Sequence, residues 1–451
     1  MKRTPLALAI ILVAVCLMFC ACTSGSADFD TARLEAQTTT IVENLLAGDY
    51  QAVTDAFAPE LLEQLPAASL QAGWEQMVNP SGDYLGQESL TSNIDANRCT
   101  VAALLRFANN GLLVSVTYDS KEQVIGMWTN YQIIDGPAAD ANYSEVDITV
   151  AGDPALPLRG KLTLPKGVEK PPVVILVQGS GSSDMNETIY SNAPFRDLAW
   201  GLAERGIASI RYNKRYYTYP DKAVELTNAV AIDDEVLGDV YAAIELAQND
   251  DRVDGEQIFV LGHSLGGMLV PAIAANHPEL AGVISMAGTL RPLYEVSYDQ
   301  SMEAAETLRP TLSEQEIAIL EAQLAQMEED MKVLRDLPTN PTLDPDTTLL
   351  GIPAIYWYSL EQYEGEKYLP QISMPMLILQ GEADFQVYAD VDYPLWQEKL
   401  ADRDNVVFHL YPGLNHLMMP TQNKRDVSEY QVKANVDQQV IDDIAAFINN
   451  N

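Results

Sequence analysis

The most constraining stretch of this chain is Gly262-His263-Ser264-Leu265-Gly266-Gly267, which lies between an apolar run, Ile258 to Leu261, and a helix-compatible run, Met268 to Ala275. A strand that reverses sharply into a helix leaves little room for side chains, so glycines two residues before and two after the turning residue indicate such a reversal. The serine hydroxyl then projects from the carboxyl edge of a sheet, and the amide of Leu265 faces any negative charge that forms nearby. The motif alone is common, but the strand and helix contexts are both present. The segment therefore predicts a nucleophile elbow with Ser264 as the nucleophile.

The chain offers four histidines as partners for this serine. A serine hydroxyl is a weak nucleophile, so a base must take its proton and an acid must hold that base in the correct tautomer. His263 lies inside the elbow, His277 ends its helix, and His409 alternates with apolar residues in a strand. His416 instead follows Gly413-Leu414-Asn415, in a loop between the last predicted strand and the last predicted helix. We therefore predict that His416 is the base.

The orienting acid is expected after the preceding strand, in the segment 380–387. Asp384 is the preferred acid, and Glu382 is its nearer rival. Asp390 and Asp392 fit better in the helix that follows. The chain order of nucleophile, acid and base is then the order found in one large class of serine hydrolases.

A second glycine-rich stretch, Gln178-Gly179-Ser180-Gly181, follows the apolar run Val173 to Val177. Its glycines let backbone amides approach a carbonyl oxygen closely. We predict that the amide of Ser180 joins the amide of Leu265 in stabilising an oxyanion.

Length and charge limit the class of protein. A chain of 451 residues with 47% apolar residues has enough material for two or three domains with sizeable cores. The formal net charge of −37 argues against a nucleic-acid partner, because phosphate binding needs a basic surface.

The first residues predict export. Two basic residues precede an apolar stretch that ends near Phe19 and is too short to cross a bilayer comfortably, which is typical of a secretory signal. The residues that follow resemble a bacterial lipobox, with Cys22 preferred to Cys20 as the acylated thiol because the bulky Phe19 precedes Cys20. We expect a lipoprotein signal peptide over residues 1–22 and an extracytoplasmic chain that is lipid-anchored to the membrane, or else secreted. Cys99 is then the remaining thiol, which excludes a disulfide framework.

Residues 28–132 predict a small α+β domain. Two stretches with helical spacing, 31–50 and 57–74, come first. The predicted strands follow at 101–107, 112–118 and 124–128, separated by turn-forming residues. The segment has no histidine, paired carboxylates or metal-ligand spacing, so it is interpreted as a binding or spacer module. Residues 133–144 are the expected linker.

Strand and helix patterns alternate over residues 145–451, which is typical of a largely parallel sheet covered by helices on both faces. The predicted strands are 146–150, 160–164, 173–177, 207–212, 258–261, 282–286, 376–380 and 406–411. One helix places apolar residues at 232, 236, 240 and 244 on a single stripe. Its acidic residues are predicted to form a solvated face: Asp233, Asp234, Glu235 and Asp239.

The alternation stops between about residues 290 and 368, where a helical insertion is predicted. A capping box at Ser313 to Glu316 begins a helix with a single apolar seam from Ile317 to Leu334. The insertion is predicted to be a cap over the active site, but a plain packing helix is about equally compatible and stays open. The aromatic residues 356–358 either line an acyl pocket or belong to the core.

These motifs together resemble a known family. From about Val146 to the C-terminus the chain is similar to α/β-hydrolases of the dienelactone-hydrolase and prolyl-oligopeptidase-like group, especially exported bacterial carboxylesterases. The resemblance is carried by residues 178–181 with Asp184, 194–199, 206–208 and 211–215, the elbow, the Asp384 segment and His416. It implies an α/β-hydrolase fold in which Ser264, Asp384 and His416 form a catalytic triad.

Two positions depart from the pattern of such esterases. Asn213 stands where they often have Asp, and Met185-Asn186 replaces the charged pair usual after Asp184, which leaves the loop geometry and substrate preference open. Residues 28–131 are similar to a domain of unknown function found in front of such hydrolases, with a cone-shaped α+β fold. The residues that carry this likeness are Leu46-Ala47-Gly48-Asp49-Tyr50, Trp74 and Gly111.

Three functional hypotheses follow. The leading one is a serine carboxylester hydrolase that acts through an acyl-enzyme on small or medium acyl esters, with no cofactor and no metal. The second is a serine peptidase, which the resemblance allows, although no repeat that would form a propeller precedes the domain. The third is a non-catalytic cell-surface binding protein, and an intact triad argues against it. The sequence gives neither the physiological ester nor the oligomeric state.

Overall fold

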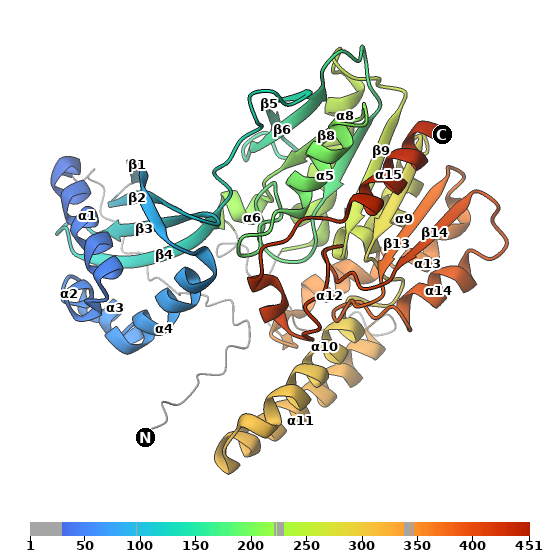
Figure 1. Ribbon diagram of the computed structural model, residues 1–451. Helices are drawn as coiled ribbons and strands as arrows, with labels where there is room; N and C mark the ends of the chain where they lie inside the picture. Colours follow the sequence, from blue (N-terminus) through green and yellow to red (C-terminus); the bar gives the residue numbers. More distant parts are fainter. Residues whose placement is uncertain (1–28, 96, 221, 223–229, 338–343, 345–346) are drawn as a thin grey trace.

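The computed structural model describes residues 29–95, 97–220, 222, 230–337, 344 and 347–451 (Figure 1). The predicted signal peptide, residues 1–22 with Cys22 and its rival Cys20, lies outside the described residues. Within the described ranges, every helix is too short or too polar to cross a membrane.

The N-terminal domain is an antiparallel sheet with helices packed on one face (Figure 1). Its strands pair in the order β1 (Tyr84–Asp95), β2 (Arg98–Phe107), β3 (Gly111–Tyr118) and β4 (Val124–Gln132). The helical elements are α1 (Thr31–Ala47), α2 (Tyr50–Thr54), α3 (Pro59–Gln64), α4 (Ala67–Val78) and η1 (Asn79–Ser81). Asp30 caps α1 by accepting a hydrogen bond from the Arg33 amide at 3.1 Å, and Gly48 ends the helix with φ 76°, a conformation that favours glycine.

Sequence analysis missed β1. Its side chains are mostly exposed and polar, so it lacks the alternation that identified the other strands. It is an edge strand that pairs with β2 through its backbone, from Tyr84 opposite Phe107 to Asp95 opposite Arg98. The linker is also shorter than expected, because β4 ends at Gln132 and the next strand begins at Tyr143.

The second sheet has eight strands in the order β14-β13-β10-β9-β7-β8-β6-β5. Their bounds are β5 (Tyr143–Val150), β6 (Leu158–Pro165), β7 (Val173–Val177), β8 (Ala208–Tyr212), β9 (Ile258–His263), β10 (Gly282–Met286), β13 (Met376–Gly381) and β14 (Val406–Tyr411). β5 and β6 are antiparallel, and the strands from β8 to β14 are parallel. Parallel strands buried on both faces need apolar side chains in both directions, which explains the continuous apolar runs in the sequence.

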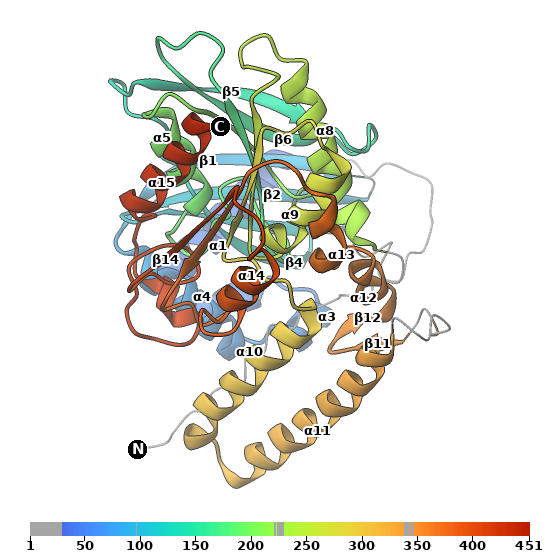
Figure 2. The same cartoon turned by 90° about the vertical axis from the view of Figure 1, so that its right-hand side faces the viewer.

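Helices cover both faces of this sheet (Figure 2). On one face, α5 (Pro194–Ala203) and α15 (Gln438–Asn450) pack on inward residues such as Val174 and Leu176. On the other, α8 (Gly238–Gln248), α9 (Leu265–Asn276) and α14 (Asp392–Lys399) share one apolar core with Val173, Ile175 and Val177. Shorter elements are α6 (Arg215–Thr218), the π-helical turn η2 (Asp233–Leu237) and η5 (Val427–Gln431).

The insertion consists of α10 (Leu293–Leu308), η3 (Arg309–Thr311), α11 (Glu314–Asp336), a small hairpin of β11 (Thr348–Leu349) and β12 (Ile352–Pro353), then α12 (Ala354–Glu361), α13 (Gly365–Tyr368) and η4 (Leu369–Gln371). The predicted capping box of Ser313 and Glu316 is present. α10 and α11 form an antiparallel hairpin that extends away from the sheet (Figures 1 and 2). The buried seam of α11 therefore packs on α10.

The prediction of a solvated acidic face on the helix after β8 is half wrong. Asp233 and Asp234 are exposed, but Glu235 and Asp239 are buried. Each buried carboxylate has a basic partner from the segment after β8: Lys214 lies 2.7 Å from Glu235, and Arg215 lies 2.8 Å from Asp239. A helical stripe pattern alone does not reveal basic residues from a distant segment, and these partners offset the cost of burying the charges.

The two domains meet at the loop between β7 and α5. Asn110, in the turn between β2 and β3, donates from Nδ2 to Ser191 Oγ at 2.9 Å, and both side chains are buried. The rings of Tyr131 and Tyr190 lie 5.4 Å apart, centroid to centroid. The N-terminal domain thus rests on a loop that reaches the candidate active site.

Candidate active site

The elbow places Ser264 between β9 and α9 with φ 53°, a strained conformation for a residue with a side chain. Its amide donates to the Met286 carbonyl of β10 at 3.0 Å. A Cβ at Gly262 would lie 2.1 Å from the Gly266 carbonyl oxygen, and a Cβ at Gly266 would lie 2.3 Å from the Val177 carbonyl oxygen. Glycine is therefore required on both sides of the turn, for the reason inferred from the sequence.

His416 contacts Asp384. The distance from His416 Nδ1 to Asp384 Oδ2 is 2.8 Å, and both side chains are buried. Oδ1 of Asp384 accepts the amides of Gln386 and Val387 at 2.8 and 2.9 Å, and Oδ2 accepts Gln380 Nε2 at 3.0 Å. With Asp384 as the acceptor, the imidazole proton lies on Nδ1, and Nε2 is left to accept a proton.

The other acids considered for this role lie elsewhere. Glu382 and Asp390 are exposed. Asp392 is buried at the start of α14, where its Oδ1 accepts Arg291 Nε at 2.8 Å. Of these acids, the structure brings Asp384 to His416.

The segments that carry the two predicted oxyanion donors both border Ser264. Leu265 is the first residue of α9, so its amide is one of the free amides at a helix N-terminus. A Cβ at Gly179 would lie 3.1 Å from Ser264 Cβ, so the loop that carries Ser180 passes directly over the elbow. Ser180 itself is exposed.

A second set of contacts, which was not predicted from the sequence, surrounds His263. Its Nε2 lies 3.0 Å from the carbonyl oxygen of His416, and its Nδ1 lies 2.9 Å from Glu187 Oε2. The other oxygen of Glu187 accepts the Gly179 amide at 2.7 Å. Burial alone would lower the pKa of His263, but the Glu187 carboxylate and the His416 carbonyl outweigh it, so the pKa is raised above 6.5. His263 and Glu187 therefore connect the histidine loop to the loop over Ser264.

The sequence contains only part of the information needed to identify Glu187 as a residue near the site. This residue lies in the loop that follows the glycine-rich stretch, close in sequence to Gly179, but nothing in the sequence indicated that its backbone turns back with φ 52°. Within the described residues, no group of three or more His, Cys, Asp or Glu side chains could hold a metal ion.

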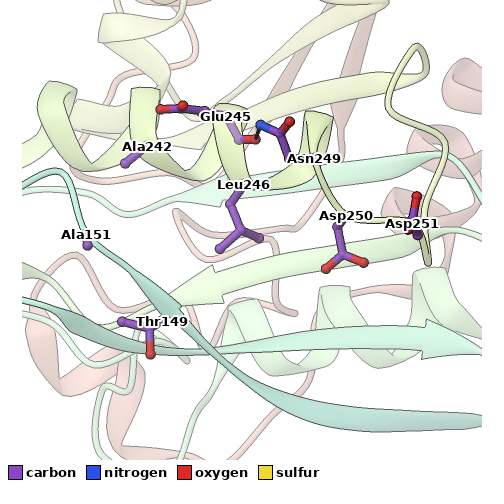
Figure 3. Close-up of a pocket in the computed structure, with 8 residues that line it drawn as sticks. All are labelled: Thr149, Ala151, Ala242, Glu245, Leu246, Asn249, Asp250 and Asp251. Carbon is purple, nitrogen blue, oxygen red and sulfur yellow. Dashed lines mark hydrogen bonds between the residues drawn. The ribbon is translucent and has the colours of Figure 1, made fainter.

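A surface depression of about 480 Å³ lies between α8 and the end of β5 (Figure 3). Its lining residues are Thr149, Ala151, Ala242, Glu245, Leu246, Asn249, Asp250 and Asp251. They include no member of the predicted triad and no basic side chain, so the depression contributes nothing to the chemistry at Ser264.

The chain is similar to several known proteins. Residues 190–422 match the family described as "Serine aminopeptidase, S33", and residues 38–127 match a family described as a protein of unknown function (DUF3887). Esterase EstD from Thermotoga maritima is 32% identical over 413 residues, which are 90% of this chain and 93% of the relative.

Two solved structures are also similar. The dienelactone hydrolase from Anabaena variabilis ATCC 29413 is 15% identical with a TM-score of 0.40, over 68% of this chain and 98% of that one. The 2,6-dihydroxy-pseudo-oxynicotine hydrolase is 17% identical with a TM-score of 0.37, over 61% of this chain and 62% of that one, so this chain spans less than two thirds of its length.

The predicted fold class, an α/β-hydrolase fold preceded by a smaller α+β domain, is confirmed by the sheet topology and the family matches. The first family covers more than half of the chain, and the relationship to an esterase extends over nearly all of it. This protein is therefore a hydrolase that belongs to the α/β-hydrolase family described as serine aminopeptidase, S33.

Proposed function

We propose that this protein is a serine carboxylester hydrolase that acts on small or medium acyl esters through an acyl-enzyme. The observation that carries the proposal is the 2.8 Å contact between His416 Nδ1 and Asp384 Oδ2 next to a strained serine elbow. The proposal assigns Ser264 as the nucleophile, His416 as the base and Asp384 as the orienting acid. The identity to an esterase supports esters as the substrate class.

The first half-reaction forms the acyl-enzyme. Ser264 Oγ attacks the ester carbonyl while His416 Nε2 takes the hydroxyl proton, and Asp384 stabilises the resulting imidazolium. The amides of Leu265 and Ser180 donate to the oxyanion of the tetrahedral intermediate. The intermediate collapses, the bond to the alcohol oxygen breaks, and His416 gives its proton to the departing alcohol.

The second half-reaction releases the acid. A water molecule attacks the acyl carbonyl as His416 Nε2 takes one of its protons, and the same two amides hold the oxyanion. Collapse breaks the bond to Ser264 Oγ, which recovers the proton from His416. The products are one carboxylic acid and one alcohol, and the enzyme returns to its starting state.

Ser264→Ala tests the proposal. The variant should lose hydrolysis of p-nitrophenyl esters and labelling by a fluorophosphonate probe while its circular dichroism spectrum stays unchanged. Ser373→Ala, which removes an exposed serine, is the matched control and should keep both. Labelling that persists in Ser264→Ala, or activity within about tenfold of wild type, would show that another residue is the nucleophile.

A serine peptidase is the second candidate, because the matching family is described as a serine aminopeptidase. Aminoacyl p-nitroanilides assayed beside p-nitrophenyl esters separate the two. Faster turnover of the anilides would replace the esterase proposal. If neither class is hydrolysed and no probe reacts, the protein is a binding protein with a hydrolase fold.

We also propose that the chain is exported and lipid-anchored at Cys22, on the basis of the basic and apolar start of the sequence. Cys22→Ala should leave the membrane fraction and lose the mass of the lipid, whereas Cys20→Ala should keep both. Membrane retention in Cys22→Ala would place the anchor elsewhere.

The insertion 290–368 is proposed to cap the site. Two contacts support this role: Gln300 of α10 donates to the Gln386 carbonyl at 2.8 Å, in the loop that carries Asp384, and Tyr356 of α12 donates to Glu235 at 2.6 Å. The base of the insertion thus touches elements on both sides of the elbow.

A further inference from the structure

A buried ammonium group lies behind the loop over Ser264. Lys214 follows β8, and its side chain is only 3% exposed. Its Nζ donates to the Gly179 carbonyl oxygen at 2.9 Å and to Glu235 Oε1 at 2.7 Å. Burying a charged lysine is costly unless the charge is paired and hydrogen-bonded, so this position needs both acceptors.

The carboxylate that pairs with Lys214 is itself held from the insertion. Tyr356 of α12 donates its hydroxyl to the second oxygen of Glu235 at 2.6 Å. Burial and the Glu235 carboxylate raise the pKa of Tyr356 well above its ordinary value, so the hydroxyl remains a donor. Both oxygens of Glu235 are therefore engaged, and the ammonium group is held in one place.

Gly179 is held from the opposite side as well. Its amide donates to Glu187 Oε1 at 2.7 Å, while its carbonyl accepts from Lys214. The Gly179 carbonyl and the Ser180 amide belong to one planar trans peptide unit, in which C=O and N–H point in opposite directions. A cation bound to that oxygen therefore fixes the direction of the Ser180 N–H and polarises it, which makes it a stronger donor.

We propose that Lys214 is a positioning residue of the oxyanion site, which holds and polarises the peptide unit carrying the Ser180 N–H through the Gly179 carbonyl. The inference rests on the proposed function, because it assigns a role in stabilising the oxyanion of ester hydrolysis. Lys214 does not touch the substrate. Its contribution appears only when negative charge develops on the carbonyl oxygen, so it raises kcat rather than substrate affinity.

The neighbouring ion pair provides a matched control. Arg215 and Asp239 are also buried, lie 2.8 Å apart and join the same two segments, but neither has a described contact with Gly179. Lys214→Met and Arg215→Met each leave one buried carboxylate unpaired, so both should lose stability. Only Lys214→Met removes the contact with the oxyanion loop.

The experiment measures kcat and KM for a p-nitrophenyl ester, and the inhibition constant of an alkyl trifluoromethyl ketone. Such a ketone adds to a serine hydroxyl and places its alkoxide where the oxyanion forms. Lys214→Met should lower kcat about 10- to 100-fold and change KM less than about threefold. This decrease in kcat is no larger than the decrease expected when an oxyanion-hole donor is removed altogether. The ketone should bind more weakly by the same factor as kcat, whereas Arg215→Met should keep both values within about threefold of wild type.

Glu235→Gln leaves an acceptor for Lys214 and should lose less activity than Lys214→Met. If Lys214→Met does not fold, the double variant Lys214→Met/Glu235→Gln, which leaves no unpaired carboxylate, takes its place. Equal effects of Lys214→Met and Arg215→Met on kcat, or unchanged ketone affinity in Lys214→Met, would overturn the inference. A wild-type protein that neither hydrolyses esters nor reacts at Ser264 overturns the proposed function instead.

Discussion

The carboxylate of Asp384 is held by residues close to it in sequence, independently of His416. Two backbone amides and the Gln380 side chain donate hydrogen bonds to it. Asp384→Asn should cost about 10⁴ in kcat, because an amide nitrogen facing Nδ1 favours the wrong imidazole tautomer. Glu382→Gln, on an exposed side chain two residues away, should be nearly silent. Ester hydrolysis by both purified variants checks this. A large loss in Glu382→Gln with little loss in Asp384→Asn would show that the acid is misassigned.

His263 gives a pH-dependent stability. The pKa of His263 in the folded protein is raised above the ordinary 6.5, so protonation of this side chain stabilises the folded state. Its contribution to the free energy of unfolding is complete below about pH 6.5 and is lost as the pH rises through the raised pKa. The free energy of unfolding of wild type minus that of His263→Gln should therefore shrink from about pH 6 to about pH 9. Urea denaturation at several pH values measures it. Glu187→Gln removes the anion that raises the pKa of His263, so in this background the effect of His263→Gln on the free energy of unfolding should depend less on pH. If the effect of His263→Gln in the wild-type background does not change with pH, the raised pKa of His263 is contradicted.

At this scale the sequence was informative about residues whose role follows from local context. Ser264 stands in a turn that requires glycines, and the positions of Asp384 and His416 follow from chain order after predicted strands. Lys214 carries no such signal, and the only signal for Glu187 is its closeness in sequence to Gly179. Lys214 reaches Gly179, 35 residues earlier, through its side chain. Contacts of this kind depend on how β7 and β8 are placed in the sheet.

Among the strands, those with a local apolar pattern were predicted and one without such a pattern was missed. The buried strands β7 and β10 were predicted with their observed bounds, because apolar residues on both faces leave an uninterrupted run. β1 was missed because an edge strand is held by backbone bonds to one neighbour and tolerates polar side chains. The last predicted helix is present as α15, and its side chains Val440, Ile444 and Phe447 are buried.

The hairpin of α10 and α11 allows the two interpretations of the insertion, an active-site cap and a plain packing helix, to be tested separately. Leu320 is buried near the start of α11, in a seam that packs on α10. Leu320→Ala should therefore lower the free energy of unfolding by about 2 to 3 kcal/mol, at the lower end for a buried leucine because the site is at the surface end of the hairpin. Chemical denaturation checks the loss, and p-nitrophenyl esters of increasing chain length check specificity.

Ile319 is the control for that change, since it adjoins Leu320 but is 53% exposed; Ile319→Ala should change neither property. A chain-length profile parallel to wild type in Leu320→Ala is expected, because the seam is filled by α10. A shifted profile would show that the distal hairpin itself reaches the acyl group and that the cap extends over its whole length.

The whole molecule joins two domains whose separate existence follows from the sequence, since their strand patterns differ and a polar linker divides them. Their contact does not follow from it. Asn110 lies in the turn that was predicted between the strands 101–107 and 112–118, but its side chain is buried against Ser191 of the other domain. The loop that carries Ser191 also carries Glu187, whose carboxylate accepts the Gly179 amide. The N-terminal domain is therefore placed to steady the loop over Ser264.

Asn110→Ala tests this connection across the molecule. Loss of the bond leaves the buried Ser191 hydroxyl without that partner, which costs about 1 to 3 kcal/mol at the domain contact. Amides of residues 187–192 should exchange with solvent faster, and kcat should fall a few-fold because the Glu187 and Gly179 contacts are held less firmly. Hydrogen exchange and ester hydrolysis measure the two effects. Asn93→Ala, at an exposed asparagine of β1 in the same domain, should change neither. Faster exchange with unchanged kcat would show that the N-terminal domain steadies the loop without influence on catalysis, and unchanged exchange would show that the contact is dispensable.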